Sequence, residues 1–145
     1  MPHLILEYSN NLPEPLDHQM LFAELHTALA HSGLFALPEI KSRAIPHDLF
    51  RVGSGLSESI FVHLTVAILS GRDLSVRQTI SADLLAVLRR AFASVWRQRP
   101  CDLTVDIREI ERATYAKAMN DAARDVDGGP GKAINVEGSW SLRPE

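Results

Sequence analysis

The chain has 145 residues, of which 46% are hydrophobic and 23% charged, so it can form one folded domain around one hydrophobic core. Fifteen basic against 18 acidic side chains give a net charge of −3, which argues against a general nucleic-acid-binding protein. No apolar run approaches the roughly 20 residues that cross a bilayer. The start MPHLILEYSN has no secretory-signal pattern. We therefore expect a cytoplasmic protein that binds neither nucleic acid nor membranes.

Cysteine and histidine usage gives no sign of a metal centre. The single cysteine, Cys101, allows neither an internal disulfide nor a cysteine zinc cluster, and we interpret it as a packing residue. His26 and His31 are five residues apart and do not share a helical face. The GGPG sequence near the C-terminus follows no strand and opens no helix, so it is not a phosphate-binding loop. We expect no metal.

The first half of the chain has the pattern strand, helix, strand. His3 to Tyr8 is an apolar hexapeptide typical of a short strand. A helix is predicted from Asp17, which can cap it, to Gly33, which suits a left-handed helix end. Its apolar stripe consists of Leu21, Leu25, Ala28 and Leu29. The stretch Glu39 to Phe50 favours a strand that ends or bends at Pro46.

The second half repeats this order. Ser59 to Leu69 is β-branched and apolar, the strongest strand signal in the chain. Ser75 and Gln78 have the spacing of a capping box, which predicts a helix start. The helical stripe that follows consists of Ile80, Leu84, Val87, Leu88, Ala91 and Val95. Pro100 ends this helix, and alternation at Leu103, Val105 and Ile107 indicates a last strand with one polar face.

Together these elements predict an α/β fold, a two-layer α+β sandwich built from two tandem β-α-β units. Each helix is long enough to connect two parallel strands. Two helices then cover one face of a four-stranded sheet and leave the other face bare. Either Val62, Leu64 and Val66 or their alternates Phe61 and His63 would lie on the bare face, which favours oligomerisation as its cover.

Pro2 is a candidate general base. Removal of Met1 would leave a free secondary amine at the start of the first strand. An unperturbed N-terminal amine has a pKa of about 7.7–8.0, and that of proline is somewhat higher. Burial and nearby cations lower this pKa toward the range in which an amine is an efficient base. On position alone, a chance Met-Pro start is the simpler explanation.

Basic residues supply candidate carboxylate-binding groups. Lys41 and Arg43 alternate in a predicted strand and therefore point to the same side. Arg72 follows the turn after the third strand, and Arg77 lies in the first turn of the second helix. Arginine holds a carboxylate through two charge-assisted hydrogen bonds. His63, in mid-strand, is more typical of a satisfied core or interface histidine.

Several segments in order resemble a known family. They are MPHLILEYSNNL, GLFALPEIKSRA, FVHLTVAILSGRDLSVRQ and LTVDIREIERATYAK. Over Pro2 to Asn120 the chain resembles the 5-carboxymethyl-2-hydroxymuconate delta-isomerases of the tautomerase superfamily. The resemblance implies a homotrimer that uses no cofactor, with Pro2 as the catalytic base. It also implies that Lys41, Arg43 and Arg72 bind the carboxylates of a small dienol substrate from aromatic catabolism.

The resemblance divides the chain into two parts and leaves other functions open. Residues 1–120 would form the tautomerase-like isomerase domain. Residues 121–145 would form a C-terminal extension, either loose or packing Trp140 on a neighbouring subunit. Lys41 stands where the most similar family members have arginine, which changes the geometry of carboxylate binding. The alternatives are hydratase, dehalogenase or decarboxylase chemistry on an unsaturated acid, or a trimeric binding protein without enzymatic activity.

Overall fold

The computed structural model describes residues 1–56 and 58–120. The predictions for residues 121–145, including the packing of Trp140, lie outside the described residues. The elements, in chain order, are β1 (His3–Ser9), α1 (His18–His31), η1 (Leu37–Glu39), β2 (Lys41–His47), β3 (Ile60–Leu69), α2 (Leu74–Ala91), α3 (Ala93–Gln98), β4 (Cys101–Ile110) and η2 (Arg112–Thr114). Over the part of the chain that the structure describes, no helix combines the length and apolar character of a membrane span.

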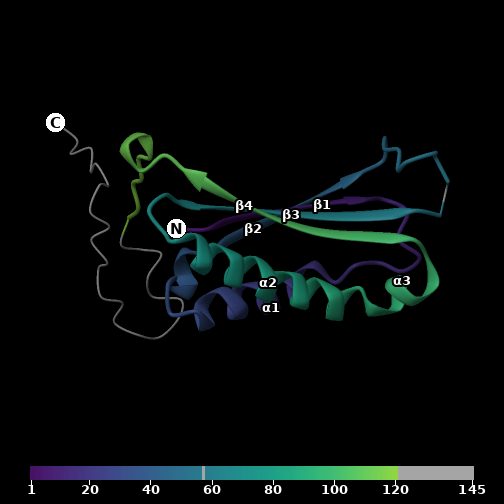
Figure 1. Cartoon of the computed structure of the whole chain (residues 1–145), viewed down its shortest axis with the longest axis horizontal. Coiled ribbons are helices and arrows are strands. Elements are labelled where there is room, and N and C mark those ends of the chain that lie inside the picture. Colours follow the sequence, from purple (N-terminus) through teal and green to yellow (C-terminus); the bar gives the residue numbers. More distant parts are fainter. Residues whose placement is uncertain (57, 121–145) are drawn as a thin grey trace.

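The four strands form one sheet in the order β2-β1-β3-β4. β1 pairs with β2 and β3 pairs with β4 in parallel, whereas β1 and β3 are antiparallel neighbours in the centre. Each parallel pair is connected through a helix, α1 in the first unit and α2 in the second. Both helices lie against the same face of the sheet (Figure 1). The predicted two-layer fold of two β-α-β units is therefore confirmed.

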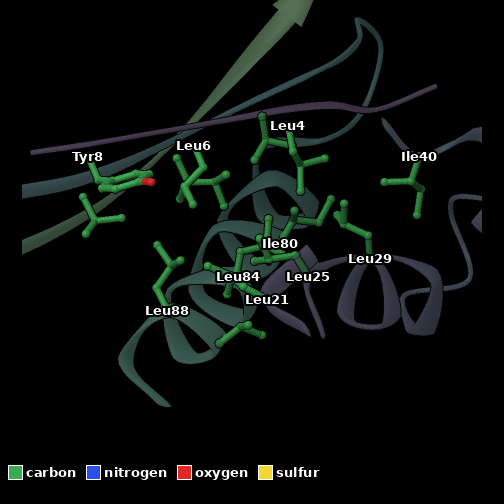
Figure 2. Close-up of a cluster of buried hydrophobic side chains, with 14 of the residues drawn as sticks. Leu4, Leu6, Tyr8, Leu21, Leu25, Leu29, Ile40, Ile80, Leu84 and Leu88 are labelled. Atoms are coloured by element: carbon green, nitrogen blue, oxygen red, sulfur yellow. The ribbon is translucent and has the colours of Figure 1, made fainter. Parts of the chain in front are cut away.

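The core lies between this face and the helices. Leu4 and Leu6 of β1 meet the apolar stripes of α1 and α2 (Figure 2). The side chains of β3 that are at most 1% exposed are those of Ile60, Val62, Leu64, Val66 and Ile68. Phe61 and His63 consequently point to the opposite face, which we call the open face. This settles which of the two alternate sets of β3 faces the helices.

The ends of α1 match their predicted signals, whereas the start of α2 does not. The Asp17 carboxylate accepts a 3.0 Å hydrogen bond from the N–H of Met20, and Gly33 has a φ of 74° just beyond the helix. The predicted capping box at Ser75 is wrong. α2 begins at Leu74 with Asp73 as the extended N-cap residue, so Ser75 is already inside the first turn and cannot cap it.

The predicted helix through Val95 is interrupted. Phe92, with φ −102° and ψ 19°, separates α2 from α3, and its ring is buried in the core. Arg99 is extended before Pro100, as the residue preceding a proline usually is. Pro46 lies within β2 on an edge of the sheet, where the missing N–H costs no ladder bond.

Candidate active site

One end of the sheet gathers four segments that are far apart in the sequence. β1 and β2 begin together, with His3 paired to Lys41. His3 also faces Ala67 near the end of β3, and Ala67 pairs with Arg108 near the end of β4. The amino terminus lies at this end, beside the turn that leads into α2 (Figure 1). We call this region, formed by the chain start, the start of β2, the β3–α2 turn and the segment after β4, the proline end.

Pro2 is fixed at the proline end by main-chain pairing. It is buried immediately before β1, and its carbonyl accepts a 3.2 Å hydrogen bond from the backbone N–H of Lys41. The Nζ of Lys41 lies 3.3 Å from the sulfur of Met1 and 3.4 Å from the carbonyl oxygen of Glu39. A lysine ammonium therefore lies next to the first residues of the chain.

Met1 carries the amino terminus in this structure, and its surroundings make this amine a weaker base than an ordinary amino terminus. Its pKa is lowered mainly because burial disfavours the charged ammonium, while the Glu39 carboxylate opposes this change. The cations Lys117, Arg72 and Lys41 lower the pKa further. A lowered pKa increases the neutral fraction of the amine near pH 7, and only the neutral amine can accept a proton.

Arg72 is held over an aromatic ring in the β3–α2 turn. Its guanidinium carbon lies 4.8 Å from the ring centroid of Phe35, and its Nη2 donates a 3.2 Å hydrogen bond to the carbonyl of Leu34. Gly71, with a φ of 109°, adopts a turn conformation that favours glycine. The turn thus orients Arg72 toward the segment between α1 and η1, and a guanidinium has further N–H donors that can bind a carboxylate.

Arg43 lies two residues after Lys41 in β2, and both side chains are on the open face. Its Nη1 is 3.5 Å from Nδ1 of His3, and Nε2 of His3 is 3.4 Å from the hydroxyl oxygen of Tyr115. The pKa of His3 is lowered by burial first, and then by Arg43, Lys41 and the amino terminus. The structure therefore places Pro2, Lys41 and Arg72 at the proline end. Arg43 is connected to them through its contact with His3.

Five residues of the proline end were not singled out from the sequence. Lys117 forms a 3.2 Å ion pair with Glu39; Phe35 supports Arg72; and Tyr115 reaches His3. Tyr115 and Lys117 lie in a segment that resembles the isomerase family, but no local periodicity or spacing distinguishes them. Their roles depend on the chain folding back from β4 to the start of β1.

Other charged groups of the sequence analysis lie elsewhere. Arg77 is 3.7 Å from Glu109, and Nδ1 of His63 is 2.6 Å from the hydroxyl of Thr104 on the open face. A shallow hollow of about 410 Å³ lies at the other end of the sheet, lined by Glu7, His47, Leu49, Phe50, Arg51, Phe61 and His63. No group of three or more potential metal ligands occurs among residues 1–56 and 58–120.

Comparison with known proteins gives a consistent result. Residues 2–124 match the family model described as 5-carboxymethyl-2-hydroxymuconate isomerase. The chain is 33% identical over 120 residues to 5-carboxymethyl-2-hydroxymuconate Delta-isomerase of Escherichia coli, covering 83% of this chain and 95% of that protein. A crystal structure of a 5-carboxymethyl-2-hydroxymuconate isomerase from Deinococcus radiodurans R1 superposes with a TM-score of 0.76 at 35% identity, covering 82% of this chain and 90% of the other.

More distant structures share the fold. A fused 4-OT wild-type symmetric trimer has a TM-score of 0.64 at 15% identity, covering 83% of this chain and 95% of the other. The four-stranded sheet with two helices is thus the fold of the tautomerase superfamily. Within that superfamily the chain belongs to the 5-carboxymethyl-2-hydroxymuconate isomerase family, and it is an isomerase.

Proposed function

We propose that this isomerase converts a carboxylated 2-hydroxydienoate, such as 5-carboxymethyl-2-hydroxymuconate, into its 2-oxo isomer without a cofactor. The name of the Escherichia coli relative supports this substrate class, which belongs to the catabolism of homoprotocatechuate and 4-hydroxyphenylacetate. The observation that carries the proposal is the buried Pro2 beside an amino terminus whose pKa is lowered by burial and by cations.

In the proposed reaction, Pro2 acts as the general base after Met1 has been removed. The proline nitrogen takes the proton of the 2-hydroxyl group, and the electron pair moves through the diene. The nitrogen then returns the proton to a distant carbon, so that a carbonyl forms at carbon 2 and the remaining double bond shifts. No atoms or electrons are gained or lost. Since one amine performs both transfers, it must be neutral at the start of each cycle.

The basic side chains are proposed to bind the carboxylates and stabilise the dienolate. Lys41 and Arg72 carry positive charge next to the amine, where negative charge develops as the hydroxyl proton leaves. Loss of Met1 would free the Lys41 ammonium from the methionine sulfur. Arg43, at the side of His3, is proposed to hold a second carboxylate.

We also propose that the active enzyme is a homotrimer located in the cytoplasm. The open face is a surface that α1 and α2 leave uncovered (Figure 1). It includes apolar groups such as Ile45, which is 43% exposed, and a sheet face of this kind needs a cover. A structural neighbour described as a symmetric trimer is compatible with the same arrangement in this chain.

Replacement of the proposed base tests the reaction directly. Pro2→Ala keeps a small second residue, so Met1 should still be removed, and turnover of a 2-hydroxymuconate-type dienol should fall about 10²–10⁴-fold. The ultraviolet absorbance of the dienol reports the rate, and the intact mass of the same sample reports removal of Met1. A processed Pro2→Ala protein with wild-type turnover would rule out Pro2 as the base. A processed wild-type protein that fails to act on the dienol would indicate another substrate or reaction.

A further inference from the structure

An ion pair at the proline end connects two distant parts of the chain. The Nζ of Lys117 lies 3.2 Å from an Oε1 oxygen of Glu39, and the two side chains are 21% and 22% exposed. Glu39 ends η1, with one residue between it and β2, whereas Lys117 belongs to the segment that follows η2. Because both groups are largely shielded from water, their charges are screened less than those of an exposed surface pair.

The pair lies among the groups that act on the amino terminus. In the described part of the chain, Glu39 is the one acidic group among these, and Lys117, Arg72 and Lys41 are the basic ones. Lys41 approaches Glu39 as well, but through the Glu39 main-chain carbonyl at 3.4 Å. Among the described residues, Lys117 is therefore the cation that contacts the Glu39 carboxylate itself.

The effect of Glu39 depends on whether its charge is compensated. An uncompensated carboxylate close to an amine stabilises the ammonium form, which cannot accept a proton. A lysine in direct contact with that carboxylate offsets its field at the amine, since the two opposite charges act over similar distances. His3, whose pKa is lowered in part by the amino terminus, adds no negative charge near the amine.

We propose that Lys117 is a positioning residue of the isomerase: by holding and neutralising Glu39, it prevents that carboxylate from pairing with the amine and blocking proton transfer. This inference rests on the proposed function, because it assigns a role relative to Pro2 as the base. Under this proposal, the segment after η2 contributes to the reaction by controlling the charge near the amine, although none of its residues is a proposed acid or base.

Acetylation of the amino terminus tests the charge effect without any substrate. Acetic anhydride reacts with the neutral amine, and mass spectrometry of the N-terminal peptide gives the rate at each pH. In Lys117→Met, the rate near pH 6–7 should fall about three- to tenfold relative to wild type, because Glu39 then stabilises the ammonium. Glu39→Gln should change the rate in the opposite direction.

Two further variants separate this role from a structural one. Lys117→Arg keeps the charge and should leave the acetylation profile as in wild type. Adding Glu39→Gln to Lys117→Met should restore the rate, because the carboxylate that held the proton is gone. The acid limb of kcat/KM should move in parallel with acetylation in each variant. An unchanged acetylation profile in Lys117→Met, or no recovery in the double variant, would overturn the proposal.

The two proposals fail in different ways. If wild-type protein acetylates as expected but shows no isomerase activity on the dienol, the proposed function is wrong, while the charge compensation by Lys117 is supported. If activity is present and Lys117→Met changes only KM, with acetylation unchanged, Lys117 does not act through the amine and the further inference is wrong.

Discussion

The two faces of the sheet are made from alternate residues of the same strands, yet they differ in almost every property. On the covered face, Leu6 and Leu64 are 0% exposed against α1 and α2. On the open face, β1 contributes His3, Ile5 and Glu7, which alternate with the core residues and are only partly buried. One face thus supplies folding energy, whereas the other carries ionisable groups and a surface suited to a partner. The proline end lies where these two faces and the loops meet.

The largest expected difference between the two faces is in how much a substitution lowers the free energy of unfolding. Leu6→Ala should lower the free energy of unfolding by about 2–5 kcal/mol, because it removes buried methyl groups and leaves a cavity. Ile5→Ala, one residue away on the open face, should cost less when measured at low protein concentration. Chemical denaturation measures both. Equal losses at every concentration would show that the two faces are packed alike.

A charge on the open face should affect assembly more than folding. Ile5 pairs with Arg43 of β2 and Thr65 of β3, so Ile5→Arg places a further cation beside Arg43 on this face. If the proposed trimer forms through this face, the folded protein should shift from trimer toward monomer, as measured by sedimentation, because an interface core excludes unpaired charge. The matched control is Glu24→Arg on the outer side of α1, which should leave the oligomeric state unchanged. A wild-type protein that sediments as a monomer would contradict the trimer.

The smallest effect is expected from the two histidines whose pKa values are lowered. Burial lowers the pKa of His3 on the open face, with contributions from nearby cations, and burial alone lowers that of His26. Since the folded protein holds these protons more weakly than the unfolded chain, the contribution of the two histidines to stability should decrease as the pH falls below about 6.5 and stay level above it. His3→Gln and His26→Gln should each flatten the dependence of Tm on pH. An unchanged slope in both variants would contradict the assignment.

The residues of the covered face could be predicted from local patterns, because burial repeats every second residue in a strand and every three to four in a helix. Local patterns could not decide whether Val62 or Phe61 faces the helices, because both alternate sets of β3 residues are apolar enough to face a core. The start of α2 was misplaced because both Asp73 and Ser75 can cap a helix, and only the backbone conformation decides between them.

The candidate residues that depend on one position could be proposed from the sequence, whereas those that depend on distant contacts could not. Pro2 became a candidate base through the family resemblance rather than through its position alone, and Arg72 became a candidate through its place in a turn. The contact of Lys117 with Glu39 spans 78 positions, and that of His3 with Tyr115 spans 112. Such contacts form because the segment after β4 folds back to the start of β1. A short window of sequence cannot predict this, because the two segments are far apart in the chain.

The hydrogen bond between the Lys41 N–H and the Pro2 carbonyl has a consequence for how the enzyme is made and handled. This hydrogen bond holds residue 2 beside the start of β2, and the residue that precedes it, Met1, lies next to the Lys41 ammonium. Maturation by loss of Met1 would then act as a one-time activation step. If Pro2 is the base, as proposed above, an affinity tag fused at the amino terminus would leave the nitrogen as an amide and give a folded, inactive protein, whereas a C-terminal tag would leave the amine free.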